Sequence, residues 1–561
     1  MGQLLTGHSR AVRGFVAAVS LTLAAGCRGT PTSIYKAPDS DLLVPVRTEP
    51  RNFTRLTSRE ETTDLVGTLI HATLVRINHL TDEVEPWLAE RWTPSTDGRS
   101  YTITLRSNVQ FSDGHAMSAD DVVFSLDAVY ASESAEAMLI GGRKITATAI
   151  DPLHVRVTFP EVFAPGIRRL DDLVILPKHK LEGALKSGAL KSAWTLATPP
   201  SEVVGLGPFV LSGYQPGQRL SFARNPHYWR HDDKGVQLPY LDRVTLDVVP
   251  DQSTQLLRME SGTADTINAA FSADAYATLK QAEAAGKLRL YDLGPAMYPD
   301  FLWFNLKPGV FEGDSRALWL QREELRHAIS MAVDRKAFVD TVFLGAGVPV
   351  YGAVSPANAK WYWKETPEIP HDAARAKQLL ASIGITPEHP GTFTLLTQKG
   401  RPALERGAAV LRDDLKPFGL NVDVVTLEGN ALVQQFLSAK YDAVFFQFSL
   451  TDTDPAMSAD VWPSAGSEHF WNREQKTPAT PWEARIDDLF RKQSSTTDPA
   501  ERKRLFDDLQ KVMVEHLPVI TFATSRVFVA SSSRLSKLTV TPGLQVPPRL
   551  LWSPDTLDVS R

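Results

Sequence analysis

A single cysteine, Cys27, stands in a chain of 561 residues, so no disulfide bond can form within one molecule. The segment before it carries two arginines, Arg10 and Arg13, followed by an apolar run from Gly14 to Ala25. A basic start, a short apolar stretch and small residues at its end are typical of a secretory signal. The exported remainder must therefore fold without disulfides, which requires a large hydrophobic core.

The end of this segment, Leu23-Ala24-Ala25-Gly26-Cys27, resembles a bacterial lipobox, in which the thiol is acylated and the cysteine becomes the new N-terminus. We expect residues 1–26 to be a lipoprotein signal peptide, Cys27 to carry the lipid and residues 27–41 to form a polar tether. The apolar run is shorter than the roughly 20 residues that span a bilayer. An ordinary signal peptide and a buried thiol stay open as alternatives. Arg28 does not assign the lipid to the inner or the outer membrane.

The composition is that of a folded exported protein. Charged residues make up 22% of the chain and apolar residues 43%, which fits a globular body. Removal of residues 1–26 takes away two positive charges and moves the net charge from -5 to -7. This mild charge predicts no nucleic-acid partner. No later apolar run reaches about 18 residues, so we expect contact with the membrane only through the lipid.

Strand and helix patterns alternate along the chain, which predicts an α/β fold with mixed sheets. Short alternating or apolar segments predict strands at 42–47, 101–106, 209–211, 219–222, 244–249 and 420–425. Apolar residues at helical spacing predict helices at 63–77, 252–260, 318–333, 372–383, 402–418 and 499–517. Ser118, with Asp121 three residues later, predicts a capping box at the start of a further helix.

A dense array of motifs occupies residues 85–125. It consists of Glu85-Pro-Trp-Leu-Ala-Glu-Arg-Trp92, the turn dipeptides Asp97-Gly98 and Asp113-Gly114, and Ser118-Ala-Asp-Asp-Val-Val-Phe-Ser125. The array resembles the signature of the bacterial extracellular solute-binding proteins of family 5, the group of the oligopeptide- and dipeptide-binding receptors. Further family motifs follow in order, among them Gly205-Leu-Gly-Pro-Phe209, Asn225-Pro-His-Tyr-Trp229 and Trp303-Phe-Asn-Leu306. The resemblance covers about residues 42–545.

The resemblance implies a two-lobed periplasmic-binding-protein fold of class II type (cluster C-like), with mixed sheets, a hinge and an extra subdomain in the first lobe. Residues 42–58, 199–269 and 519–561 are expected to form the first-lobe core, and residues 59–198 the extra subdomain. Residues 270–518 are expected to form the second lobe. The segment 516–522 is expected to be the return crossing between the lobes.

The same resemblance implies a substrate-binding lipoprotein of an ABC importer. It would capture a peptide or another small polar solute between its lobes and deliver it to the permease subunits. We expect a monomer in the periplasm, anchored to the cell envelope. A receptor for signalling or chemotaxis, and a secreted enzyme on the same scaffold, stay open as alternatives. The sequence contains no G-x-x-x-x-G-K-[ST], H-E-x-x-H or G-x-S-x-G motif, so we expect no catalysis, no cofactor and no metal.

In peptide-binding members of the family, an aspartate four residues before a proline pairs with the ammonium group of the peptide. In the matching segment, 448–455, that position is Thr451, and Asp452 comes one residue later. A buried ammonium without a carboxylate is costly. Therefore either Asp452 takes the role, or the ligand is a sugar, an opine, a modified peptide or another solute. The other candidate ligand-binding residues are Phe448, Asp454, Glu49, Arg51, Trp303, Asn305, Gln398, Arg401 and Trp462.

Replacing Cys27 by Ser removes the only thiol that a lipid can modify. We expect the Cys27→Ser protein to leave the membrane fraction, because a lipid chain is the expected link to the membrane. Fractionation with immunoblotting measures the release, and titration with a bound solute measures binding. Loss of solute binding in this variant would contradict a role of Cys27 as a tether alone.

Overall fold

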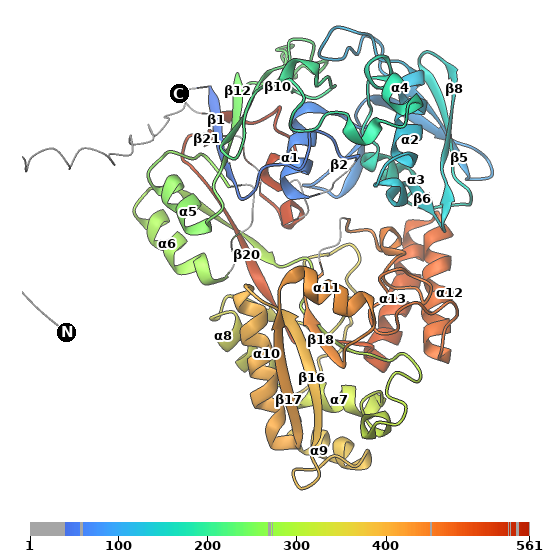
Figure 1. Ribbon diagram of the computed structural model, residues 1–561, viewed down its shortest axis with the longest axis vertical. Coiled ribbons are helices and arrows are strands. Elements are labelled where there is room, and N and C mark those ends of the chain that lie inside the picture. Colours follow the sequence, from blue (N-terminus) through green and yellow to red (C-terminus); the bar gives the residue numbers. More distant parts are fainter. Residues whose placement is uncertain are drawn as a thin grey trace, which may run out of the picture. The chain divides into compact units, whose positions relative to one another are not determined.

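The computed structural model describes residues 40–559, except 57–59, 268–270, 272, 449–451, 537, 539 and 546–548. Cys27, the expected signal peptide and nearly all of the expected tether lie outside the described residues. The described chain alternates helices and strands in several sheets, as expected for an α/β protein (Figure 1). The sheets β1-β12-β11-β10 and β17-β16-β18-β14-β19 are mixed. No helix in this part of the chain is both long and apolar enough to cross a membrane.

The first lobe is built on a four-stranded sheet with the order β1-β12-β11-β10. Its strands are β1 (Asp41–Val46), β12 (Arg243–Val248), β11 (Arg219–Arg224) and β10 (Phe209–Gln215). β1 is buried along its whole length although it stands at the end of this sheet. Asp265 satisfies the backbone of Leu43 on its outer side: its N–H donates to Leu43 O at 2.9 Å, and its carboxylate accepts from Leu43 N at 3.0 Å.

A second sheet of the first lobe is antiparallel, with the order β4-β5-β9-β8. Its strands are β4 (Ala89–Pro94), β5 (Ser100–Leu105), β9 (His154–Thr158) and β8 (Thr146–Asp151). Helix α2 (Ala119–Tyr130) packs against β8 and β9. The predicted capping box at its start is confirmed, and Ser118 N donates to Asp121 Oδ2 at 2.9 Å.

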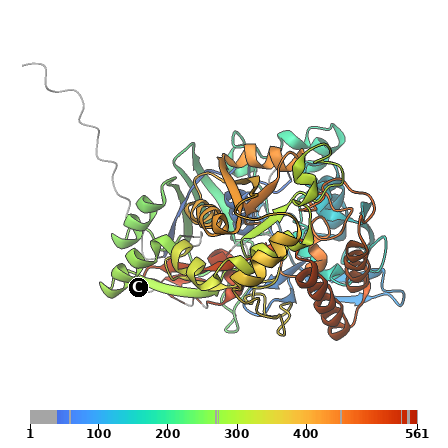
Figure 2. The same cartoon turned by 90° about the horizontal axis from the view of Figure 1, so that it is seen from below.

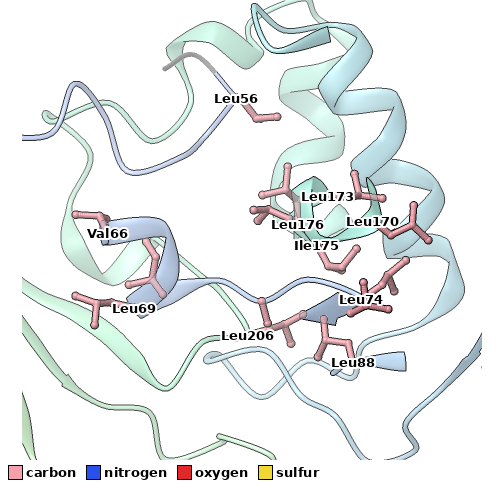
Figure 3. Close-up of a cluster of buried hydrophobic side chains, with 14 of the residues drawn as sticks. Leu56, Val66, Leu69, Leu74, Leu88, Leu170, Leu173, Ile175, Leu176 and Leu206 are labelled. Carbon is pink, nitrogen blue, oxygen red and sulfur yellow. The ribbon is translucent and has the colours of Figure 1, made fainter. Parts of the chain in front are cut away.

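Part of the core of the first lobe is a group of buried aliphatic side chains (Figure 3). They come from the loop that holds Leu56, from α1 (Glu61–Ile70), from the segments around the short strands β2 (Val75–Asn78) and β3 (Glu83–Pro86), from the loop 170–176 and from the loop 205–207. Burying one such leucine stabilises the fold by about 1.5–3 kcal/mol. The residues labelled in Figure 3 are Leu56, Val66, Leu69, Leu74, Leu88, Leu170, Leu173, Ile175, Leu176 and Leu206.

The second lobe is built on a five-stranded sheet with the order β17-β16-β18-β14-β19. Its strands are β17 (Leu420–Leu427), β16 (Gly391–Gln398), β18 (Ala443–Phe446), β14 (Phe301–Phe304) and β19 (Val519–Thr521). Successive side chains of a strand point to opposite faces. Phe301 and Trp303 accordingly belong to one hydrophobic core, and Leu302 and Phe304 to another. Because both faces of β14 are buried, this strand is entirely apolar.

Further helices and short strands complete the described chain. The helices are α3 (Gly166–Arg169), α4 (Lys178–Lys186), α5 (Gln252–Glu260), α6 (Tyr276–Ala284), α7 (Glu323–Ala332), α8 (Arg335–Val342), α9 (Ala373–Ser382), α10 (Pro402–Leu415), α11 (Gly429–Leu437), α12 (Pro481–Ser495) and α13 (Pro499–His516). The shorter strands are β6 (Leu139–Ile140), β7 (Arg143–Lys144), β21 (Leu535–Ser536) and β22 (Asp558–Val559). Figure 2 shows α12 and α13 side by side, as their mutual packing requires.

A three-stranded sheet, β13-β20-β15, leads toward the first lobe. It consists of β13 (Arg289–Pro295), β20 (Ala523–Ser531) and β15 (Gly347–Pro349), and β20 is the long strand near α5 and α6 in Figure 1. At its end, Ser531 pairs with Thr266, and Ser532 N donates to Asp265 O at 2.6 Å. We therefore propose a crossing between the lobes at 265–266 and 531–532. The expected return crossing at 516–522 includes β19, which pairs with β14 of the five-stranded sheet.

Most predicted elements are confirmed, but two predicted helices differ. The helix predicted at 63–77 ends at Ile70, because the Ile70 carbonyl accepts a hydrogen bond from Gly207 N at 3.0 Å and the chain then enters β2. The helix predicted at 318–333 begins at Glu323. Before it, the Gln321 side chain donates to Asn305 O and Lys307 O at 3.0 and 2.9 Å, which holds a turn.

Gly205 offers a direct test of this packing. A Cβ added there would lie 1.8 Å from Ile70 O, so Gly205→Ala must displace the end of α1. We expect the variant to lose about 1–3 kcal/mol of unfolding free energy or more, as overpacked sites do. Chemical denaturation followed by circular dichroism measures the loss. The control is Gly183→Ala in α4, where a Cβ meets nothing within 4 Å, and which should gain about 0.5–1 kcal/mol. Equal stability of the two variants would contradict the packing.

Candidate ligand-binding site

The predicted segment 448–455 places two buried aspartates beside arginines. Asp452 is 7% exposed and Asp454 is 6% exposed. Phe448 is half-buried and stacks against Phe470, with ring centroids 4.1 Å apart. Thr451, the position that matches the family's anchoring aspartate, lies outside the described residues. Phe448, Asp452 and Asp454 are the predicted site residues of this segment that the structure describes.

Asp452 pairs with Arg168, a first-lobe residue at the end of α3. Arg168 Nε donates to both carboxylate oxygens of Asp452, at 2.8 and 2.9 Å. Its Nη2 donates to Asp82 Oδ1 at 2.7 Å and to Thr453 Oγ1 at 2.9 Å, and its Nη1 donates to the Asp82 carbonyl at 2.9 Å. One buried guanidinium is therefore shared by two carboxylates, Asp82 from the first lobe and Asp452 from the second. We call these residues, with Thr453, the Arg168 cluster.

Further hydrogen bonds hold the segment that carries Asp452, and one more joins the lobes near it. Tyr298 Oη donates to the Asp452 carbonyl at 3.2 Å, and Asn358 Nδ2 donates to the Thr453 carbonyl at 2.9 Å, so both hold the segment to the second lobe. Between the lobes, Ala164 N donates to Ser494 O at 2.7 Å. The segment after Asp454 continues this contact, since Ala456 packs in the first-lobe core.

The Arg168 cluster bears directly on the expected role of Asp452. Burial raises the pKa of Asp452 to about 6, and the Arg168 guanidinium acts in the opposite direction. The carboxylate already has a cation and also accepts from Asp454 N at 2.7 Å. An ammonium group from a ligand would have to displace Arg168. The geometry therefore argues against Asp452 as an anchor for a peptide N-terminus.

Asp454 has a structural role. Arg502 of α13 donates to its two carboxylate oxygens at 2.7 and 3.0 Å. The same carboxylate accepts from Ala456 N at 3.0 Å and so caps the 3₁₀ helix Pro455–Ser458. Both oxygens are thus engaged within the second lobe.

Polar residues gather where the parallel strands of the second lobe end. β16 and β18 run parallel, and Phe301 at the start of β14 pairs with Phe446 at the end of β18. This register puts Gln398, Gln447 and Asp300 at one edge of the sheet, which we call the β16–β18 edge. In open α/β sheets ligands bind outside the carboxyl ends of the strands, where the strand order reverses. The order reverses here, because β17 and β18 lie on opposite sides of β16.

Two predicted residues, Gln398 and Arg401, lie at this edge. Arg401 is exposed and precedes α10, and its Nη2 donates to Gln447 Oε1 at 3.4 Å. Gln447 Nε2 donates in turn to the Tyr298 carbonyl at 3.1 Å. Tyr298 also contacts Asp452, so the loop before β14 connects the β16–β18 edge with the Arg168 cluster.

Sequence reasoning missed Asp300, which is 4% exposed. Its Oδ2 is buried without a hydrogen-bond partner among the described residues. Burial raises the pKa of Asp300 to about 7, and the charge of Arg401 acts in the opposite direction. An acidic residue directly before an apolar strand was the signal in the sequence, but such residues are common at strand ends.

Three predicted residues lie in the interior instead. Trp303 and Trp462 are 1% and 6% exposed and belong to the aromatic core of the second lobe. Asn305 Nδ2 donates to the carbonyls of Ala439 and Tyr441 at 2.9 and 3.1 Å. The polar group of Asn305 thus holds the chain after β14 rather than facing a ligand.

The two candidates on the opening loop stay in the first lobe. Glu49 Oε2 accepts from Gly217 N at 2.8 Å and from Tyr214 Oη at 2.7 Å, and these bonds lower the pKa of Glu49. The Arg51 side chain is exposed, and its backbone N–H donates to Thr63 Oγ1 at 3.1 Å. Their contact with a ligand remains a prediction.

The first lobe also contains a cavity of about 90 Å³ that the sequence did not indicate. His71, His79, Asp171, Arg76 and Trp87 are among its lining residues. Burial lowers the pKa of both histidines to about 4 and raises the pKa of Asp171 to about 7. Among the described residues, no three His, Cys, Asp or Glu side chains converge as metal ligands. The cavity therefore suits a few water molecules better than a metal ion.

The fold defines a class of two-lobed solute-binding proteins. The oligopeptide-binding protein AppA of Bacillus subtilis, solved in complex with a nonapeptide, has the same fold with a TM-score of 0.70. The two sequences are 24% identical, and the alignment covers 93% of this chain and 99% of AppA. The chain belongs to the bacterial extracellular solute-binding proteins of family 5, whose model ("family 5 Middle") matches residues 83–469. The resemblance drawn from the motifs at 85–125 is thereby confirmed.

Curated relatives match this chain over most of its length. A probable ABC transporter-binding protein of Deinococcus radiodurans is 26% identical over 514 residues, which is 85% of each chain. Heme-binding protein A of Haemophilus influenzae is 27% identical over 496 residues, 84% of this chain and 85% of its own.

Removing the charge of Arg168 should weaken the contact between the lobes. Arg168→Met leaves the buried carboxylate of Asp452 and the partly exposed carboxylate of Asp82 without their shared cation, and breaking a buried ion pair costs about 3–5 kcal/mol. Urea denaturation at pH 7 measures the loss. The control is Arg143→Met in the same subdomain, whose exposed pair with Glu161 should contribute less than about 1 kcal/mol. If both variants unfold at the same urea concentration, the Arg168 cluster does not stabilise the protein.

Proposed function

We propose that the protein is the substrate-binding component of an ABC importer, which captures a small polar solute between its lobes and delivers it to a membrane permease. The observation that carries this proposal is the family match over residues 83–469 together with the two-lobed fold. The name of the Deinococcus relative supports the same role. Binding without catalysis is part of the proposal.

The class of solute follows from the chemistry of the site more than from the relatives. One relative is named for heme, and AppA was solved with a nonapeptide, so similar scaffolds hold different cargo. In this chain the β16–β18 edge presents Arg401, Gln398 and Gln447, which favours a polar solute. Asp452 is occupied by Arg168, which argues against the peptide-anchoring arrangement expected from the family.

Capture works by shifting an equilibrium between open and closed arrangements of the lobes. A ligand favours the closed state only by the contacts that it makes there and not in the open state. Moving such an equilibrium from 1:99 to 99:1 takes about 5.5 kcal/mol. The crossing segments at 265–266 and 531–532 pair with each other, which makes them the natural hinge. If contacts such as the Arg168 cluster form only on closure, they stabilise the closed state. They then lower the binding free energy that the ligand must supply to close the protein.

The expected place of the protein is the cell envelope. We propose that Cys27 is lipidated and that the lipid holds a monomeric receptor in the cell envelope, within reach of its permease. A single acyl chain binds a membrane only weakly, so stable anchoring needs more than one chain. Signalling instead of uptake is the second candidate function, and it predicts the same binding without transport.

Identification of the cargo tests the proposal. We expect native mass spectrometry of the purified protein to show a small molecule bound one to one, which is released unchanged on denaturation. Deletion of the gene should abolish uptake of that molecule when it is supplied with an isotope label. Normal uptake with a lost transcriptional or motility response would establish signalling instead. Conversion of the molecule into a product by the purified protein would overturn the proposal of a binding protein.

A further inference from the structure

The contact between the lobes holds fewer positive than negative charges. Arg168 is 7% exposed, and it donates to Asp82 of the first lobe and to Asp452 of the second. Lys360 Nζ of the second lobe lies 3.1 Å from Glu83 Oε1 and 3.9 Å from Asp82 Oδ2, and its side chain is 44% exposed. Two cations thus face three carboxylates, and in the buried part Arg168 alone serves two of them.

The titratable groups that face this contact from the neighbouring segments do not supply the missing positive charge between pH 5 and pH 7. His79 is uncharged there, because burial lowers its pKa to about 4. Tyr298 donates its hydroxyl to the Asp452 carbonyl and stays uncharged, because burial raises its pKa. Asp171 can only add negative charge, and burial raises its pKa to about 7.

A proton on Asp452 makes up the shortage. Burial raises the pKa of Asp452 to about 6, although the Arg168 guanidinium acts against this shift. The neighbouring Asp454 also raises it, but the charge of Asp454 is paired with Arg502. When the lobes separate, water surrounds Asp452 and its pKa returns to the ordinary value of 3.8. The joined state therefore binds more protons than the separated state between these two values, so a falling pH favours the joined state.

We propose, building on the proposed capture of a solute between the lobes, that the Arg168 cluster is a latch that one proton on Asp452 tightens. Protonated Asp452 still offers an oxygen to Arg168, while the guanidinium charge is balanced by Asp82. The three groups then carry no net charge, which removes the cost of an unpaired buried charge. Mild acid thus lowers the free energy of closing, and a solute bound between the lobes is held more tightly.

Distances between spin labels on the two lobes test the latch without any solute. The labels are attached through Lys186→Cys on α4 and Arg491→Cys on α12, two exposed positions, in the Cys27→Ser protein. Double electron–electron resonance gives the ratio of joined to separated molecules at pH 5 and at pH 7. We expect this ratio to be about tenfold higher at pH 5, as the pKa of about 6 in the joined state and 3.8 in the separated state requires.

Three variants assign the response to its group. Asp452→Asn should give the same ratio at both pH values, because its amide oxygen accepts from Arg168 but takes up no proton. Asp82→Asn should also flatten the response, because Arg168 then serves Asp452 alone and lowers its pKa. The matched control is Asp171→Asn, which removes a neighbouring carboxyl that titrates in the same range and should keep the rise. Circular dichroism establishes that each variant is folded.

The outcomes separate the latch from the proposed function. A wild-type ratio that stays constant or falls at pH 5 overturns the latch. A rise that persists in Asp452→Asn, or one that disappears in Asp171→Asn, overturns the assignment to Asp452. The importer proposal survives each of these results as long as mass spectrometry finds a bound solute and uptake of that solute depends on the gene.

Discussion

The buried guanidinium of Arg168 is the interaction on which the rest of the site depends. It lies between Asp82 of the first lobe and Asp452 of the second, and both carboxylates accept from it at hydrogen-bond distance. Taking charges out of water is costly unless each is paired, so these three groups constrain one another strongly. The segment after Asp452 enters the first-lobe core through Ala456, which ties this contact to hydrophobic packing as well.

The same arrangement divides the acidic residues near the ligand region into two kinds. Asp452 and Asp454 are neutralised by arginines of the protein, whereas Asp300 is left without a partner at its buried oxygen. A receptor must bind its solute reversibly and differently in two states, so charges already compensated within the protein add little selectivity. We therefore propose that the solute contacts the polar residues of the β16–β18 edge rather than Asp452 or Asp454.

Local chemistry made much of the fold predictable. The capping box of Ser118 and Asp121 and the left-handed Gly419, with φ 85°, mark boundaries that depend only on neighbouring residues. Tertiary contacts decided the boundaries that were missed, as at Ile70, where Gly207 takes over the carbonyl. The site residues were harder to predict from the sequence for the same reason. The segment with Asp452 was recognised, but its partner Arg168 is 284 residues away and carries no local signal.

A crystal structure of the protein with its bound cargo is the most direct measurement. We expect the cargo to lie at the β16–β18 edge, while Arg168 still bridges Asp82 and Asp452. A cargo ammonium seated on Asp452, with Arg168 displaced, would contradict this arrangement.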